Sequence, residues 1–161
     1  MNQLKIACTG HRTERLRGKE EVVKEWIKDV VGHFATYCYE DVMLLCGGAE
    51  GTDEIFGQMV FDKTIPPVRL ALYLPCRDYR AKELAYFNEE LSSKVWAYES
   101  WRRGADNRRD RMMVDDCDVL LAVWDGLEVG GTWKTIEYAR KKNKIIMYIP
   151  KEIFYEGEIN K

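Results

Sequence analysis

The sequence predicts an α/β domain built on a mostly parallel, doubly wound sheet. Short apolar runs alternate along the 161 residues with longer segments in which apolar residues recur at helical spacing. Strands that alternate with helices of ten or more residues are typical of βαβ units, whose crossovers are right-handed. No repeat, low-complexity stretch or long linker divides the chain, and its length suits one domain. We therefore expect residues 1–161 to form a single Rossmann-like domain.

The predicted elements follow one another in regular order. We expect strands at residues 4–8, 42–46, 68–74, 119–124 and 144–149. We expect helices at residues 22–34, 52–60 and 84–95, where apolar residues recur at helical spacing. We also expect an arginine-rich helix at residues 106–116 and a last helix at residues 132–142. Residues 96–101 are ambiguous and fit a short strand followed by a loop. The run from Val119 to Trp124 is continuous in apolar residues, as in a strand that is covered on both faces.

The bulk composition excludes several classes of protein. A hydrophobic fraction of 46% with 32% charged residues is ordinary for a folded domain, and a net charge of −2 does not favour general nucleic-acid or membrane affinity. The five cysteines are odd in number and show no CxxC spacing, which favours free thiols over disulfides or zinc. The N-terminus lacks a signal-peptide pattern, and no apolar run approaches the ~20 residues that span a bilayer. We expect a soluble cytoplasmic protein with no metal and no cofactor.

A glycine-rich segment, residues 47–54, joins the second predicted strand to the next helix. Glycines let the backbone turn tightly and bring its N–H groups close to an anion, and the helix N-terminus adds partial positive charge. The segment is not a Walker A loop, because no Gly-Lys-Ser/Thr follows. The alternative is a plain turn between strand and helix. As ligand-binding candidates it supplies Gly47, Gly48, Ala49, Gly51, Thr52 and Asp53.

A second glycine-rich segment, residues 125–132, follows the strand at residues 119–124. Its ligand-binding candidates, with the residue that ends the strand, are Trp124, Gly130, Gly131 and Thr132. In a parallel sheet the strand-to-helix loops lie at the carboxyl edge, where ligands bind. Two glycine-rich loops at one edge are stronger evidence for a phosphate site than either alone.

The first predicted strand ends in four further ligand-binding candidates, Thr9, Gly10, His11 and Arg12. They offer a hydroxyl, a flexible turn and a cation at the same edge of the sheet. His11 has an ordinary pKa near neutrality and is a candidate general base. A histidine without a visible partner is also typical of a simple ligand contact.

Five arginines gather between residues 102 and 111, and their planar guanidinium groups suit phosphate recognition. Asn107, Arg108 and Arg111 are the ligand-binding candidates, because they begin the segment that leads into the strand at residues 119–124. The alternative is a solvated face on which the arginines pair with neighbouring aspartates.

Together these motifs resemble the SLOG superfamily, and within it the YpsA-like branch. Residues 47–53 are similar to the glycine-rich motif of DNA-processing protein A, and residues 9–12 to the start of YpsA-like proteins. Residues 107–114, Asp118, Trp124 and residues 130–132 resemble the second half of those proteins. The resemblance covers roughly residues 3–150. It implies a Rossmann-like domain whose two glycine-rich loops bind a nucleotide or an ADP-ribose-type ligand.

The same superfamily includes the LOG enzymes, which cleave an adenine-type base from ribose 5′-monophosphate. They use an arginine and the glutamate of a PGGxGTxxE motif. In this chain the proline is absent, Lys134 and Thr135 stand where the glutamate is expected, and Glu137 lies on a different face of the helix. We therefore do not infer the LOG hydrolase activity for this chain from the resemblance.

Three functional hypotheses follow. The leading one is a module that binds a nucleotide-type small molecule as a sensor or by sequestering it. The second is a nucleotide N-glycosidase with Glu54 and Asp125 as candidate catalytic acids, and with Asp53 and Glu137 as further acids. The third, a single-stranded nucleic-acid binder, is disfavoured by the acidic charge balance. We expect no membrane partner. Trp96, Tyr98 and Trp101 fit either a homo-oligomer surface or a core.

Overall fold

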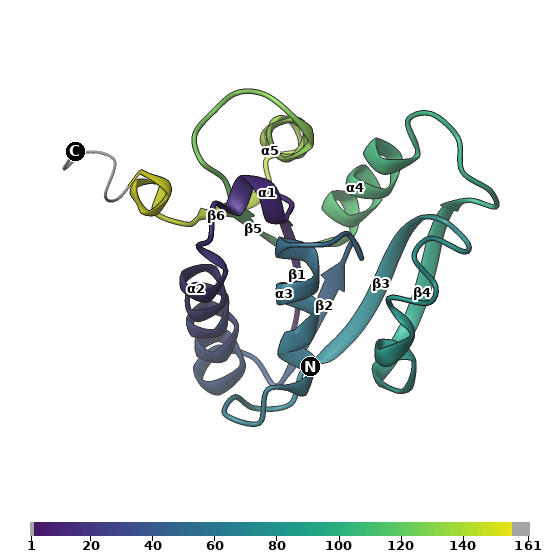
Figure 1. The fold of residues 1–161 in the computed structure, drawn as a ribbon. Coiled ribbons are helices and arrows are strands. Elements are labelled where there is room, and N and C mark those ends of the chain that lie inside the picture. Colours follow the sequence, from purple (N-terminus) through teal and green to yellow (C-terminus); the bar gives the residue numbers. More distant parts are fainter. Residues whose placement is uncertain (1, 156–161) are drawn as a thin grey trace.

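Six parallel strands form the centre of the computed structural model, which describes residues 2–155 (Figure 1). The strands are β1 (Gln3–Gly10), β2 (Asp41–Cys46), β3 (Arg69–Cys76), β4 (Leu91–Tyr98), β5 (Val119–Val123) and β6 (Ile145–Tyr148). Their order across the sheet is β4-β3-β2-β1-β5-β6, and every neighbouring pair is parallel. The predicted Rossmann-like, doubly wound fold is confirmed.

Strand β1 occupies the point at which the strand order reverses. Ile6 pairs with Leu44 of β2 on one side and with Val119 of β5 on the other. The chain runs outward from β1 through β2, β3 and β4, and then returns to the opposite side of β1 as β5 and β6. In open α/β sheets ligands bind outside the carboxyl ends of the strands at such a reversal. The fold therefore predicts a ligand site at the carboxyl ends of β1 and β5.

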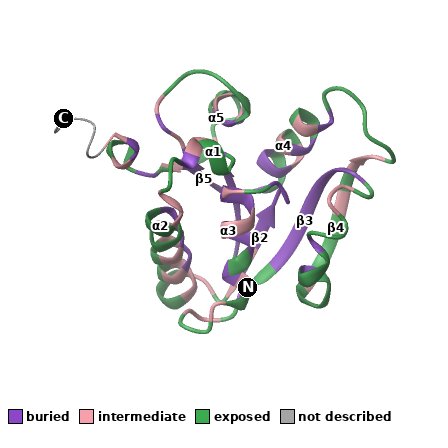
Figure 2. Cartoon of the chain, in the orientation of Figure 1, coloured by how far each residue is buried: buried purple, intermediate pink, exposed green. Residues whose placement is uncertain are grey.

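Helices cover both faces of the sheet. The α-helices are α1 (Thr13–Leu16), α2 (Glu20–His33), α3 (Thr52–Gly57), α4 (Ala105–Asp116) and α5 (Gly131–Lys141). Shorter helical turns are η1 (Phe34–Cys38, π-helical) and the 3₁₀ turns η2 (Gln58–Phe61), η3 (Ala85–Glu90) and η4 (Lys151–Phe154). Helices α2 and α3 contribute to the core on one face, and α4 and α5 to the core on the other. Buried residues accordingly line the strands through the middle of the molecule (Figure 2).

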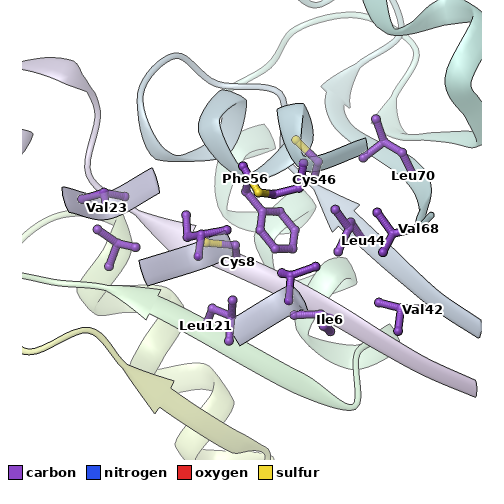
Figure 3. Close-up of a cluster of buried hydrophobic side chains, with 14 of the residues drawn as sticks. Ile6, Cys8, Val23, Val42, Leu44, Cys46, Phe56, Val68, Leu70 and Leu121 are labelled. Carbon is purple, nitrogen blue, oxygen red and sulfur yellow. The ribbon is translucent and has the colours of Figure 1, made fainter. Parts of the chain in front are cut away.

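The two cores follow from the alternation of side chains along the strands. Leu4, Ile6 and Cys8 of β1 point into the larger core, whereas Ala7 points into the smaller one. Figure 3 shows Ile6 and Cys8 of the larger core close to Leu44, Phe56 and Leu121. Helix α2 enters this core with a helical stripe, because Val23, Ile27 and Val31 recur every four residues and are fully buried.

The helix predicted at residues 84–95 is wrong. Leu84 and Phe87 are buried, but Leu84 only precedes the short turn η3, which contains Phe87, and the chain then extends as strand β4. Leu91 pairs with Leu70 and Val95 with Tyr73 at the edge of the sheet. Apolar residues that recur every three or four positions therefore extend over two elements, the turn η3 and the strand β4. The ambiguous residues 96–101 contain the end of β4 and the loop that follows it.

Two general expectations concern cysteines and membranes. All five cysteines are free thiols. Cys38 is exposed, and the other four are buried. Within residues 2–155 no helix has the length and apolar character needed to cross a membrane.

Candidate functional site

A cavity of about 530 Å³ opens at the carboxyl ends of the central strands, at the reversal point of the sheet. It is bounded by the end of β1, by the loop after β2 and by the N-terminal halves of α1, α3, α4 and α5. Its lining residues are Cys8, Thr9, Gly10, His11, Arg12, Glu14, Arg15, Ala49, Asp53, Gly104, Asp106, Asn107, Arg109, Asp110, Gly131, Thr132 and Lys134. Nine of these are residues that the sequence marked as ligand-binding candidates.

The end of β1 is joined tightly to the start of α3. The hydroxyl of Thr52 donates to the carbonyl of His11 at 2.8 Å, and the Thr52 N–H donates to the same oxygen at 3.2 Å. A Cβ on Gly10 would lie 2.4 Å from Cγ2 of Thr52, so only glycine fits there. Thr52 thus fixes the end of β1, while Thr9, Gly10 and His11 face the cavity.

The first glycine-rich loop is packed largely against the protein itself. A Cβ on Gly47 would lie 2.6 Å from Oδ2 of Asp53, and one on Gly51 would lie 2.8 Å from the backbone nitrogen of Thr13. The N–H of Ala49 donates to Oδ2 of Asp53 at 3.2 Å. Of this segment only Ala49 and Asp53 line the cavity. Gly47, Gly48, Gly51 and Thr52 shape the loop from outside the lining.

The second glycine-rich loop presents a more open surface. Gly130 has a positive φ of 92° and precedes helix α5, which starts at Gly131 without a side-chain cap. A Cβ on Gly131 would meet no atom within 4 Å, and Gly131, Thr132 and Lys134 line the cavity. The first N–H groups of a helix lack internal partners and carry partial positive charge. This end of the cavity is therefore suited to an anion.

A buried arginine, Arg109, forms the floor of the cavity. Its Nη1 donates to the carbonyl of Gly47, its Nε donates to Oδ1 of Asp110 at 2.7 Å, and its Nη2 lies 3.6 Å from Oδ1 of Asp106. That oxygen of Asp106 is a buried polar atom without a hydrogen-bond partner among the described residues. Three carboxylates, with that of Asp53, thus surround one guanidinium group.

Two carboxyl groups of the floor, those of Asp53 and Asp110, hold protons more strongly than usual. Burial raises the pKa of Asp53 to about 6, Arg109 opposes this rise, and the nearby charge of Asp110 adds to it. The pKa of Asp110 is also raised by burial, against the attraction of Arg109. A buried carboxyl group that titrates near neutral pH in a cavity is a typical feature of functional sites.

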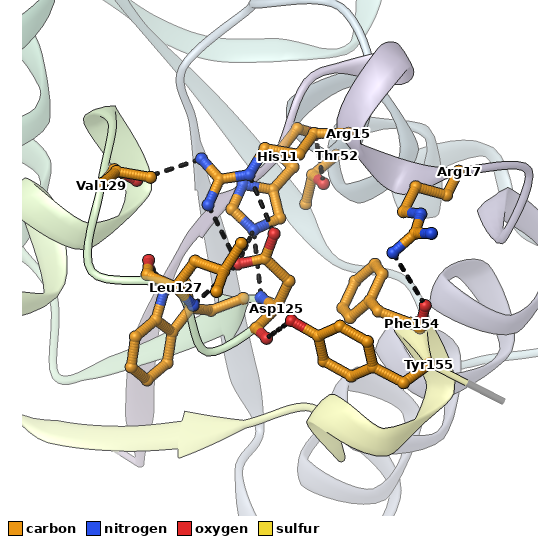
Figure 4. Close-up of polar contacts among 10 residues, drawn as sticks. His11, Arg15, Arg17, Thr52, Asp125, Leu127, Val129, Phe154 and Tyr155 are labelled. Carbon is orange, nitrogen blue, oxygen red and sulfur yellow. Dashed lines mark hydrogen bonds and ion pairs between the residues drawn. The ribbon is translucent and has the colours of Figure 1, made fainter. Parts of the chain in front are cut away.

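A polar network closes the other side of the cavity (Figure 4). Nε2 of His11 accepts a hydrogen bond from the Asp125 N–H at 3.0 Å and lies 3.2 Å from Oδ1 of the same residue. Burial lowers the pKa of His11 against the opposing pull of the Asp125 carboxylate, so the ring is neutral at pH 7. Burial alone would raise the pKa of Asp125, but hydrogen bonds from Arg15 and the Leu127 N–H lower it.

The two residues predicted as catalytic acids do not line the cavity. Glu54 accepts hydrogen bonds from Arg80 at 2.6 Å and from the Tyr86 hydroxyl at 3.2 Å, on the outer side of α3. Asp125 is buried behind His11 and Arg15, and its carboxylate is occupied by the network just described. The carboxyl groups that do line the cavity are those of Glu14, Asp53, Asp106 and Asp110.

The three ligand-binding candidates between residues 107 and 111 lie in two different places. Asn107 lines the cavity, but Arg108 and Arg111 lie over the rings of Tyr98 and Tyr138, outside its lining. Trp124 is likewise outside the lining. Its indole N–H donates to the Leu127 carbonyl at 2.9 Å, and its ring stacks on Trp133.

Arg109, the buried arginine of the cluster, was not among the ligand-binding candidates. A signal was present, because Ala105, Arg109 and Met113 recur every four residues and are all buried on one face of α4. An arginine in the apolar stripe of a helix is rarely solvated. Arg15 and Lys134 were also missed, and they carry no comparable signal.

Comparison with known proteins supports the fold alone. No protein-family model matches the chain, and no curated protein matches its sequence. The solved structure of TM1055, a structural-genomics target, is similar with a TM-score of 0.58 and 18% identity, over 89% of this chain and 72% of that one. The molybdenum cofactor carrier protein from Chlamydomonas reinhardtii is similar with a TM-score of 0.59 and 16% identity, over 98% of this chain and 86% of that one. The chain shares the Rossmann-like fold of these proteins.

Proposed function

We propose that the cavity binds a nucleotide-type ligand, with its phosphate at the start of helix α5. The observation that carries this proposal is that an open helix N-terminus and two cations line the same cavity. Gly131 leaves room for close approach, and none of the described acids pairs with Arg12 or Lys134, which line the same space. A phosphate there would accept backbone N–H groups and charge-assisted hydrogen bonds.

The floor of the cavity suits the sugar of such a ligand. Asp106 keeps a buried oxygen without a hydrogen-bond partner among the described residues, and Asp53 lines the same cavity. Carboxylate oxygens accept hydrogen bonds from hydroxyl groups, and a buried acceptor is costly to leave unpaired. A volume of about 530 Å³ lies within the range of small-molecule sites. The cavity therefore offers acceptors for hydroxyl groups and donors for a phosphate.

This proposal places the chain among nucleotide-binding relatives of the SLOG superfamily, in its YpsA-like branch, acting as a sensor or a sequestering module. The support is the sequence resemblance together with the shared fold. One protein of that fold is named as a carrier of the molybdenum cofactor, which fits a role in holding a small molecule.

The test is a panel of adenine, guanine, cytosine and uracil mononucleotides, with inorganic phosphate as the control. We expect a mononucleotide to raise the melting temperature more than phosphate does, because phosphate reaches only one end of the cavity. Stabilisation amounts to about 2.7 kcal/mol at a ligand concentration a hundredfold above Kd. If no nucleotide changes the melting temperature at millimolar concentration, the proposal is wrong.

A second candidate, nucleotide N-glycosidase activity, is favoured by one observation. Asp53 lines the cavity with a pKa raised to about 6, as a group that activates water or protonates a leaving base requires. Release of free base should be followed in the same panel. If base is released, Asp53→Asn should slow it at least a hundredfold, since general acid–base catalysis contributes about 10²–10⁴-fold. Binding without release leaves the sensor or sequestering role.

A further inference from the structure

A second recess lies beside the cavity along helix α4, between the end of β4 and helix α5. It has a volume of about 490 Å³, and we call it the arginine groove. Its lining residues are Tyr98, Gly104, Asn107, Arg108, Arg111, Met112, Asp115 and Tyr138. Gly104 and Asn107 line both the cavity and the arginine groove, so the two recesses adjoin.

The connection between them is also lined by polar groups. A smaller pocket of about 140 Å³ shares Asn107, Asp110 and Lys134 with the cavity, and Arg111 and Tyr138 with the arginine groove. Asn107 and Arg111 are one turn apart on α4, about 6 Å along the helix surface. A ligand that extends from the cavity along α4 would meet Arg111 within a single turn.

The cations of the arginine groove are held in place but not neutralised. Arg108 lies over the ring of Tyr98 at 5.3 Å, and Arg111 lies over the ring of Tyr138 at 5.2 Å. Neither guanidinium forms an ion pair with an acid among residues 2–155. The acid of the groove, Asp115, already accepts a hydrogen bond from the Tyr138 hydroxyl at 2.7 Å. Stacking on an aromatic ring leaves the N–H edge of a guanidinium free for a phosphate.

We propose that the arginine groove binds a second phosphate, carried by a second nucleotide unit of the ligand. This inference rests on the proposed function, because it requires the first unit to occupy the cavity. The preferred ligand is then a dinucleotide. Its first phosphate lies at α5, and its second lies between Arg108 and Arg111.

The experiment compares four ribonucleoside 5′-monophosphates with their 5′-phosphorylated homodinucleotides by calorimetric titration. We expect the dinucleotide of the preferred base to bind at least tenfold more tightly than its mononucleotide, since a charge-assisted hydrogen bond to phosphate is worth about tenfold or more in affinity. Arg108→Ala and Arg111→Ala should remove most of this gain and leave mononucleotide binding within twofold. Arg103→Ala is the matched control, because Arg103 is exposed and lines neither recess.

The outcomes separate the two proposals. If mononucleotides bind but dinucleotides bind no better, the arginine groove is not a ligand site and the proposed function stands. If neither class binds, both proposals fail. A ten-residue homopolymer of the preferred nucleotide is the last probe. Affinity more than tenfold above that of the dinucleotide would identify the occupant as single-stranded nucleic acid and would overturn the dinucleotide assignment.

Discussion

The guanidinium of Arg15 holds the carboxylate of Asp125 through two hydrogen bonds, from Nε to Oδ2 at 2.9 Å and from Nη2 to Oδ1 at 3.0 Å. The third nitrogen, Nη1, donates to the carbonyl of Val129 at 3.0 Å. One side chain on α1 therefore fixes both ends of the loop that connects β5 to α5 (Figure 4). The same Asp125 positions His11 through its backbone N–H.

Removing this pair should loosen the loop and the cavity together. We expect Asp125→Ala to lower the free energy of unfolding by about 1–3 kcal/mol, because it leaves Arg15 and the Leu127 N–H without their acceptor. Ligand binding should weaken as well, since the loop that leads to Gly131 loses the hydrogen bonds between Arg15 and the Asp125 carboxylate. Urea denaturation and ligand-induced melting shifts measure the two effects. Arg77→Ala, which removes an exposed ion pair with Glu99, is the control and should change neither.

Much of the fold followed from the sequence, because buried strands and helical stripes leave a local pattern. The continuous apolar run at β5 and the stripe of α2 are such patterns. Strand β4 was missed since it lies at the edge of the sheet, where its partly exposed residues alternate weakly and Leu84 and Phe87 mimic a helical spacing.

The site was predicted less completely, for a physical reason. The glycine-rich loops identified the correct edge of the sheet, but the partners of each side chain come from distant segments. Arg109 meets Gly47 across 62 positions, and Arg15 meets Asp125 across 110. A single sequence does not reveal which of five clustered arginines turns inward. It also does not reveal that Glu54 pairs with Arg80 on the outside of α3.

Gly131 and Gly47 should respond differently to substitution. Gly131→Val adds a side chain in open space at the proposed phosphate position, so we expect a native melting temperature and loss of the nucleotide-induced shift. Gly47→Ala places a Cβ against Asp53 and the Arg109 guanidinium, and overpacking of this kind costs about 1–3 kcal/mol. Melting scans with and without the preferred nucleotide distinguish the two. Undiminished binding by Gly131→Val would remove α5 from the proposed phosphate site.

The stability of the fold should depend on the ionisation of Asp53. Its folded-state pKa is raised from the ordinary 3.8 to about 6, so the group stabilises the folded state fully below pH 4, and this contribution is lost as the pH rises through 6. The change corresponds to about 3 kcal/mol at most. We expect the free energy of unfolding of the wild type, relative to Asp53→Asn, to fall between pH 4 and pH 7. Urea titrations at several pH values test this, and a difference that does not vary with pH would contradict it.

Arg109 should be the most important cation for folding. Arg109→Ala leaves the carboxyl groups of Asp53 and Asp110 buried without a counter-charge, and breaking a buried pair in this way costs about 3–5 kcal/mol. Arg108→Ala changes the adjacent residue but removes an exposed side chain, so we expect its stability to remain close to that of the wild type. Urea denaturation of both variants measures the difference.

The pH dependence of the Arg109→Ala loss identifies its cause. Arg109 lowers the pKa of Asp53, so without it this carboxyl group should titrate at a still higher pH. The loss should therefore be smaller at pH 5, where Asp53 is protonated, than at pH 8, where its charge is buried without a partner. Adding Asp110→Asn to Arg109→Ala should restore part of the stability at pH 8, because it removes one of the three like charges. If the loss is equal at both pH values and Asp110→Asn restores nothing, Arg109 acts through its hydrogen bond to the Gly47 carbonyl and its packing, and not through charge.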